Sequence, residues 1–322
     1  MNKKLLYIIS IITITLLAAC NNKEQPKENK DVISVHTTVY PLQYFTERIG
    51  GDAVDVHSIY PPGADEHTFD PTQKDMMAMA DSDLFFYVGL GLEGFVENAK
   101  KTLKNEHVKM VSTADSIPED LFEDGQDHDD GTELDDHGHE EHNHEHGSID
   151  PHVWISPILS DALAYSIKEA LIEAAPDKKA VFEKNFEELR DDLLELDRKF
   201  IDMASNAPIK TFFVSHASFG YIADTYGLEQ VAIAGLNSQS EPSQKQLASL
   251  VDYAETHEVG YVLFEQNVSS KLTEVIRKEL GAKSLMLHNL GVLTTEDVEN
   301  EDDYFSLMEH NIQTLSEALS GK

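Results

Sequence analysis

The chain has 322 residues, 41% of them hydrophobic, a formal net charge of −34 and one cysteine, Cys20. A surface this acidic repels nucleic acid and attracts cations, although acidity alone also keeps an exported protein soluble. One cysteine allows neither an intramolecular disulfide nor a thiolate metal site, so any metal must bind nitrogen and oxygen. We therefore expect no nucleic-acid partner, and a chain long enough for two domains.

Residues 1–19 have the features of a signal peptide for export. Two lysines precede an apolar run of about 13 residues, which is shorter than the ~20 needed to span a membrane as a helix. Two alanines lie directly before Cys20, and this string resembles a lipobox, whose cysteine becomes the lipidated N-terminus. We expect acylated Cys20 to anchor the protein in the lipid bilayer at the outer face of a bacterial cell membrane, with residues 20–31 as a flexible tether. The alternative is an ordinary secretory signal with a chance cysteine.

Residues 32–175 are expected to form an N-terminal lobe, because strand and helix patterns alternate along them. Strands are predicted at 33–40, 53–59, 83–90 and 107–112, and helices at 42–51, 72–82 and 94–104. Asp70 and Pro71 favour the start of the second helix, as its N-cap and first-turn proline. Such alternation implies a mostly parallel sheet with helices on both faces.

The segment 126–146 interrupts this pattern, since it holds six histidines, nine acidic residues and almost nothing apolar. It cannot fold onto a core and is expected to be a disordered loop. Its histidines, which are candidate weak auxiliary metal ligands, are His128, His137, His139, His142, His144 and His146.

Residues 176–205 are predicted to form one long amphipathic helix that links two lobes. Its apolar residues recur at helical spacing: Val181, Phe182, Phe186, Leu189, Leu193, Leu196 and Phe200. Residues 206–322 repeat the alternation as a C-terminal lobe, with strands at 210–216, 229–234, 259–265 and 283–288 and helices at 219–227, 243–257, up to 280 and at 302–319. The predicted fold class is α/β: two doubly wound lobes, each a mostly parallel sheet flanked by helices, joined by one long rigid linker helix.

Four histidines lie where the loops of such a fold converge. His67 lies beyond the second predicted strand, His152 follows the histidine-rich segment, and His216 and His288 each end a strand. Ligands of doubly wound sheets bind outside the carboxyl ends of the strands, where all of these except His152 fall, together with Glu265. A single histidine there is usually structural, whereas several at equivalent places in two lobes favour a metal site.

The chain also carries a set of distinctive motifs: PPGADEHTFDPT, the acidic histidine-rich segment before DPHVWISP, SHASFGYIADTYGL, GLNSQSEPSQKQL and LFEQNVSSKL. In combination they resemble the zinc- and manganese-specific solute-binding lipoproteins of bacterial ABC importers, and most closely the zinc branch. The similarity runs from about residue 32 to the C-terminus. The resemblance implies that His67, His152 and His216 bind the metal ion and that the partner is the membrane permease of a zinc ABC importer. We expect a monomer.

The ligand chemistry favours the same ion. Three neutral imidazoles suit Zn²⁺, Mn²⁺ is the second choice because it prefers oxygen ligands, and Cu²⁺ must be excluded by availability and geometry. A carboxylate in place of His216 would resemble the manganese branch. The fourth ligand stays open, because some relatives carry a carboxylate where this chain has Gly291, which cannot coordinate through a side chain. Water is favoured, then His288, then Glu265.

Other residues near this site have two interpretations each. Asp70 and Asp150 either accept the distal N–H of a ligand imidazole or cap local turns. Trp154 and Tyr221 either line the cleft or belong to the core between the lobes.

Taken together, the patterns favour a binding protein that captures Zn²⁺ outside the cytoplasm and delivers it to an importer. The alternatives are a manganese-binding importer component, a cell-surface adhesion or zinc-storage lipoprotein and, least favoured, a zinc hydrolase with Glu265 as general base. No enzyme is expected, because the chain lacks H-E-x-x-H, G-x-S-x-G and a phosphate-binding glycine loop. The segment 126–146 is interpreted as a weak zinc collector at low supply, with a zinc sensor and a solubilising insertion as alternatives.

Overall fold

The computed structural model describes residues 32–122, 149–237, 242–257, 259–266 and 271–321. The predicted signal peptide, the tether, Cys20 and the histidine-rich segment with its six histidines lie outside these residues. Residues from Ile33 onward belong to a single unit. Within the described part, each helix is too short or too polar to cross a membrane.

Four parallel strands form the sheet of the N-terminal lobe, in the order β2–β1–β3–β4. Their bounds are β1 (Ile33–Thr37), β2 (Val54–Ser58), β3 (Leu84–Tyr87) and β4 (Lys109–Ser112). Each strand falls within a predicted one. The inner strand β3 is buried along its whole length, as is usual in a parallel sheet covered on both faces.

The helices of this lobe are α2 (Tyr40–Gly50), α3 (Gln73–Asp81), α4 (Val96–Leu103) and α5 (Pro157–Ala174), with 3₁₀ turns η1 (Gly51–Ala53), η2 (Thr113–Ser116), η3 (Glu119–Leu121) and η4 (Val153–Ile155). No helix is predicted at α5 from its sequence. Its apolar residues lie on most of its sides, and this weakens the helical period on which such predictions depend.

The N-cap prediction for α3 is wrong. The cap is Thr72, whose hydroxyl oxygen accepts the backbone N–H of Asp75, while the Asp75 carboxylate accepts the backbone N–H of Thr72. This reciprocal capping box satisfies two N–H groups at the helix start. Asp70 lies two residues too early and is exposed.

The C-terminal lobe repeats the same sheet, in the order β6–β5–β7–β8. Its strands are β5 (Thr211–His216), β6 (Glu229–Ala234), β7 (Tyr261–Phe264) and β8 (Lys283–Met286), and its helices are α7 (Gly220–Tyr226), α8 (Gln244–Thr256), α9 (Lys271–Glu279), α10 (Thr295–Glu299) and α11 (Tyr304–Ala318). The prediction of two parallel α/β lobes is confirmed. β8 ends earlier than predicted, so His288 lies in the loop that follows it.

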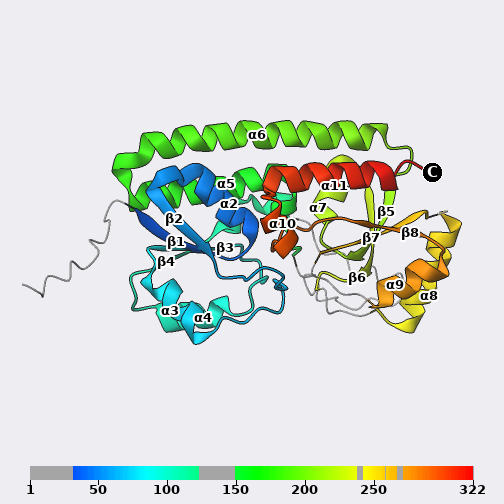
Figure 1. Ribbon diagram of the computed structural model, residues 1–322, viewed down its shortest axis with the longest axis horizontal. Coiled ribbons are helices and arrows are strands. Elements are labelled where there is room, and N and C mark those ends of the chain that lie inside the picture. The colour runs from blue at the N-terminus through cyan, green and yellow to red at the C-terminus, as the bar shows by residue number, and fades with distance from the viewer. Residues whose placement is uncertain (1–31, 123–148, 238–241, 258, 267–270, 322) are drawn as a thin grey trace, which may run out of the picture. The chain divides into compact units, whose positions relative to one another are not determined.

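The long helix α6 (Lys179–Asn206), preceded by the 3₁₀ turn η5 (Pro176–Lys178), corresponds to the predicted linker helix. Its 28 residues extend over about 40 Å at a rise of 1.5 Å each. The predicted apolar face is buried from Phe182 to Phe200, but Val181 is 52% exposed and does not belong to it. The helix packs against α2 and α5 of one lobe and against α7 and α11 of the other (Figure 1).

Buried apolar side chains also join the lobes. One large cluster includes Phe45 and Trp154 of the N-terminal lobe together with Leu287 and Tyr304 of the C-terminal lobe. A small second cluster around Phe213 lies within the C-terminal lobe. Because the large cluster is continuous, packed side chains as well as α6 hold the strand-end loops of the two sheets in place.

Candidate metal centre

Three separate segments carry the three histidines of the predicted site. His67 lies in the loop after β2, where the Asp65 carboxylate accepts its backbone N–H at 2.9 Å. His152 directly precedes η4, and His216 is the last residue of β5. His152 and His216 are fully buried and His67 is partly buried. Both lobes therefore contribute to one place in the fold.

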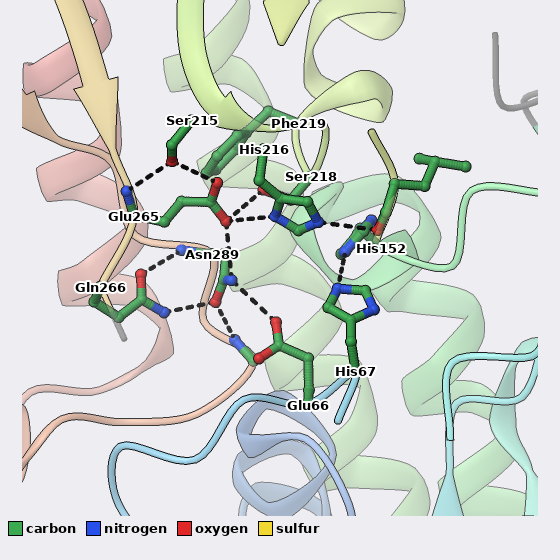
Figure 2. A network of polar contacts seen from close by, with 12 residues as sticks. Glu66, His67, His152, Ser215, His216, Ser218, Phe219, Glu265, Gln266 and Asn289 are labelled. Carbon is green, nitrogen blue, oxygen red and sulfur yellow. Dashed lines mark hydrogen bonds and ion pairs between the residues drawn. The ribbon is translucent and has the colours of Figure 1, made fainter. Parts of the chain in front are cut away.

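The three imidazole rings meet there (Figure 2). The ring centroids are 5.1 Å apart for His67 and His152, 5.1 Å for His67 and His216, and 4.9 Å for His152 and His216. One ring nitrogen from each lies within 4.8 Å of the other two. Within the described part of the chain, no other group of three or more histidine, cysteine or acidic side chains brings its ligand atoms this close.

Asp150 orients the ring of His152. Its Oδ1 accepts Nδ1–H of His152 at 2.7 Å and the backbone N–H of the same residue at 2.9 Å. The hydrogen bond expected for Asp150 is thus present, and it leaves Nε2 of His152 directed at Nε2 of His67, 3.1 Å away. Asp70 is exposed and makes no hydrogen bond to these rings among the described residues, so that part of the prediction is wrong.

Glu265 orients the ring of His216 in the same manner. Its Oε2 accepts Nδ1–H of His216 at 2.9 Å, while Nε2 of His216 faces the backbone carbonyl of Leu236 at 3.0 Å. The Glu265 carboxylate also accepts the hydroxyls of Ser215 and Ser218 and one amide N–H of Asn289. Glu265 therefore lies behind His216, on the side away from the other two rings, and the structure does not place it as a fourth ligand.

The pKa values of His67 and His216 are shifted in opposite directions. Burial, with the nearby rings of His152 and His216, lowers the pKa of His67 to about 2, so this ring is neutral. Burial also opposes charge on His216, but the Glu265 carboxylate and the Leu236 carbonyl outweigh it and raise the pKa of His216 to about 9. Burial raises the pKa of Glu265, but the charge of His216 and the hydrogen bonds from His216 and Ser218 together outweigh burial, so the pKa lies below its ordinary value. His216 must lose a proton before its Nε2 can bind a metal ion.

His288 is held by local partners instead of joining the cluster. Its Nδ1 accepts the backbone N–H of Leu290 at 2.9 Å, and its Nε2–H donates to Asp297 at 3.0 Å. Both ring nitrogens are thus occupied, one by Leu290 in the loop after β8 and the other by Asp297 of α10. The structure gives His288 a structural role, and it does not support the ranking of this residue as a possible fourth ligand.

Two residues of the site were not predicted, Glu66 and Asn289. The Asn289 amide donates to Oε1 of Glu66 and to Oε2 of Glu265, at 3.0 Å each, and its Oδ1 accepts from Gln266 at 2.5 Å (Figure 2). Burial raises the pKa of Glu66 to about 7. The position of Glu66 next to His67 was the one signal in the sequence. Nothing in the sequence pointed to Asn289.

Gly291 makes room for Glu66. A Cβ atom at this position would lie 2.6 Å from Oε1 and 2.7 Å from Cδ of Glu66, which is closer than real Cβ contacts occur. The carboxylate of Glu66 therefore occupies the space beside Gly291 that a side chain would need.

Trp154 and Tyr221 contribute to the site and to the core together. Both are almost fully buried. The ring of Trp154 lies 5.4 Å from the ring of His152, and its N–H donates to the backbone carbonyl of Asn289 at 2.7 Å. The hydroxyl of Tyr221 donates to the backbone carbonyl of Asp150 at 2.8 Å. Each side chain therefore lies beside the site and also belongs to the buried core.

Two doubly wound lobes whose loops bring three imidazoles together define a two-lobed solute-binding protein with a nitrogen-rich site. Within that class, the chain belongs to the family of zinc-uptake complex component A, the periplasmic ZnuA family, whose model matches residues 35–318. The family resemblance noted in the sequence is thereby confirmed.

Individual relatives agree with this placement. The chain is 34% identical over 315 residues to the zinc-binding lipoprotein AdcA of Streptococcus pneumoniae, covering 98% of this chain and 61% of that protein. It is 36% identical over 314 residues to the high-affinity zinc uptake system protein ZnuA of Bacillus subtilis, covering 94% of each. The crystal structure of the Zn(II)-bound ZnuA-like domain of S. pneumoniae AdcA superimposes with a TM-score of 0.71 at 32% identity, over 90% of this chain and 99% of that one. The chain thus spans about 61% of the length of AdcA.

Proposed function

We propose that this protein captures Zn²⁺ outside the cytoplasm with His67, His152 and His216 and delivers it to the membrane permease of a zinc ABC importer. The observation that carries the proposal is the convergence of three imidazoles from three segments and two lobes, with ligand nitrogens within 4.8 Å of one another. Neutral imidazoles suit Zn²⁺ better than Mn²⁺. The names of AdcA and ZnuA, which describe zinc binding and zinc uptake, support the same ion.

The hydrogen bonds around the rings prepare them for an ion. Asp150 and Glu265 each bind Nδ1 of a histidine, which fixes the ring and leaves Nε2 as the ligand atom. In the structure Nε2 of His216 faces the Leu236 carbonyl. Binding therefore exchanges this carbonyl and one proton for the ion, and release to the permease reverses the exchange.

The fourth ligand in this proposal is water or the nearby carboxylate of Glu66. His288 and Glu265 are engaged elsewhere, whereas Glu66 is buried beside His67, and the Asn289 amide donates to its carboxylate. The hydrolase alternative requires Glu265 as a free general base. Glu265 accepts hydrogen bonds from four residues, and this favours binding and transport over catalysis.

Anchoring and ion collection complete the proposal. Acylated Cys20 would hold the protein at the outer face of the cell membrane, and AdcA, a relative, is a lipoprotein by name. Residues 126–146 would collect ions weakly and pass them to His152, which follows six residues after His146. Such proximity raises the effective concentration of a captured ion at the tight site.

Metal analysis of the protein purified without added metal tests the function. We expect one Zn²⁺ per chain that resists a weak chelator, and displacement of bound Mn²⁺ by stoichiometric Zn²⁺. Retention of Mn²⁺ in the presence of Zn²⁺ would favour the manganese alternative. Turnover of model esters or peptides by the zinc-loaded protein would favour the hydrolase.

A further inference from the structure

A second pair of imidazoles lies outside the three-histidine cluster, on the sheet of the N-terminal lobe. β1 and β2 run parallel with His36 opposite His57 and Ser34 opposite Asp55. Because side chains alternate along a strand, these four residues share one face of the sheet. β2 is the outer strand of this sheet (Figure 1), so His57 lies at its edge.

The two rings are neighbours, although the ligand atoms of His36, His57 and Asp55 do not lie as close together as those of the three-histidine cluster. Their centroids are 5.6 Å apart, compared with 4.9 to 5.1 Å within the three-histidine cluster. An oxygen ligand is also close, because Oδ1 of Asp55 lies 3.3 Å from Nε2 of His57. Two imidazoles and a carboxylate are a set that borderline divalent ions bind in proteins.

Two of the three groups are accessible, and the third has a ring nitrogen without a partner among the described residues. The side chains of His57 and Asp55 are 59% and 66% exposed. Nδ1 of His36 is buried and has no hydrogen-bond partner within the described residues. Burial first, and then His57, lower the pKa of His36, while Asp55 and Asp75 act weakly in the opposite direction.

We propose that His36, His57 and Asp55 form a second and weaker site for a divalent transition-metal ion, such as Zn²⁺, Ni²⁺ or Cu²⁺, at the edge of the N-terminal sheet. The site is weaker than the three-histidine cluster because it offers two imidazoles instead of three and stands in solvent. This second site does not depend on the proposed delivery of Zn²⁺ to the permease, and it stands even if that proposed function is wrong.

The test uses the full chain with its tight site first filled by one equivalent of Zn²⁺. Cu²⁺ is then added as a paramagnetic probe, and line broadening of backbone amides is followed by NMR. We expect broadening centred on β1 and β2, in addition to any in the histidine-rich segment. Because the broadening is assigned residue by residue, ions bound at β1 and β2 are distinguished from ions bound by the histidine-rich segment.

Variants identify the ligands. His57→Gln should weaken the broadening at β1 and β2 by at least ~10-fold, because even losing a supporting partner of a metal ligand costs 10–100-fold. His310→Gln, at an exposed histidine of α11, is the matched control and should leave it unchanged. Both variants should keep the tight Zn²⁺ site. The proposal is overturned if the parent shows no broadening at β1 and β2, or if His57→Gln retains it.

Discussion

Zinc binding is expected to displace a proton from His216, and Glu265→Gln is expected to remove most of that proton release at pH 8. The reason lies in the metal-free ring, where Nδ1 and Nε2 both face oxygen acceptors, the carboxylate of Glu265 and the carbonyl of Leu236. These acceptors stabilise the imidazolium. A ligand ring must be neutral, so protons and Zn²⁺ compete for His216.

The magnitude follows from the raised pKa of His216, which is about 9. At pH 8, roughly nine-tenths of these rings carry a proton, so each Zn²⁺ displaces about one. His67 is neutral and Glu66, with a pKa of about 7, is mostly ionised, so neither adds much at this pH. Raising the pH removes the competing proton, and affinity should rise about 10-fold from pH 7 to pH 8 through His216 alone. The loss of affinity thus begins well above pH 6, where unperturbed histidines would place it.

Calorimetry in buffers of different ionisation enthalpy counts the released protons. In Glu265→Gln the charge that raises the pKa of His216 is gone, burial then lowers the pKa, and proton release at pH 8 should fall towards zero. Affinity at pH 9 should still fall by at least ~10-fold, because Glu265 orients the ring. Glu299→Gln, an exposed site with the same chemical change, is the control.

Two results would refute this reasoning. The parent protein would release no proton at pH 8, or Glu265→Gln would release as many protons as the parent. The first result would mean that His216 is already neutral before zinc binds. The second would mean that Glu265 is not what keeps the ring protonated.

Three further changes have defined outcomes. Gly291→Ala should destabilise the fold by about 1–3 kcal/mol in chemical denaturation, because its Cβ would press on Glu66, whereas Gly94→Ala, with nothing within 4 Å, should not. Asn289→Leu should cost at least about 2 kcal/mol in the same assay and should weaken zinc binding, because two buried carboxylates lose their amide donor. Removing residues 126–146 should leave the tight site and eliminate the weak sites of this segment in calorimetry; loss of the tight site would mean that this segment supplies a ligand.

The position of a residue along the chain predicted much of the site. His67 follows β2 and His216 ends β5, in two sheets with the same order, and the strand-end rule places each residue at the carboxyl edge of its own sheet. The rule says at which edge a residue lies and not which way its side chain points. Glu265 satisfies the rule and yet lies behind His216, and His288 satisfies it and binds Asp297 instead.

Contacts between distant segments were beyond sequence reasoning. Asn289 binds Glu66 across 223 residues of the chain, and no periodicity or spacing encodes such a pair. By contrast, the error at the start of α3 was avoidable. Thr72 and Asp75 have the spacing of a capping box, which satisfies two backbone N–H groups at the helix start. Thr72 was therefore a better N-cap candidate than Asp70.

The predicted strands were recovered because apolar runs flanked by polar turns are typical of buried parallel strands. α5 was missed for a related physical reason. A helix packed on several sides loses the apolar stripe that identifies a surface helix, and α5 buries residues around most of its circumference. α6 keeps such a stripe, and it was found.

The central claim, that His67, His152 and His216 hold the ion, is tested most directly by competitive chelator titration of the three single alanine variants. Each variant should bind Zn²⁺ at least ~10-fold more weakly than the parent at pH 8, with thermal unfolding measured alongside to confirm that it folds. His310→Ala, at an exposed histidine, should bind as the parent does. Three folded variants that bind Zn²⁺ as tightly as the parent would contradict the assignment.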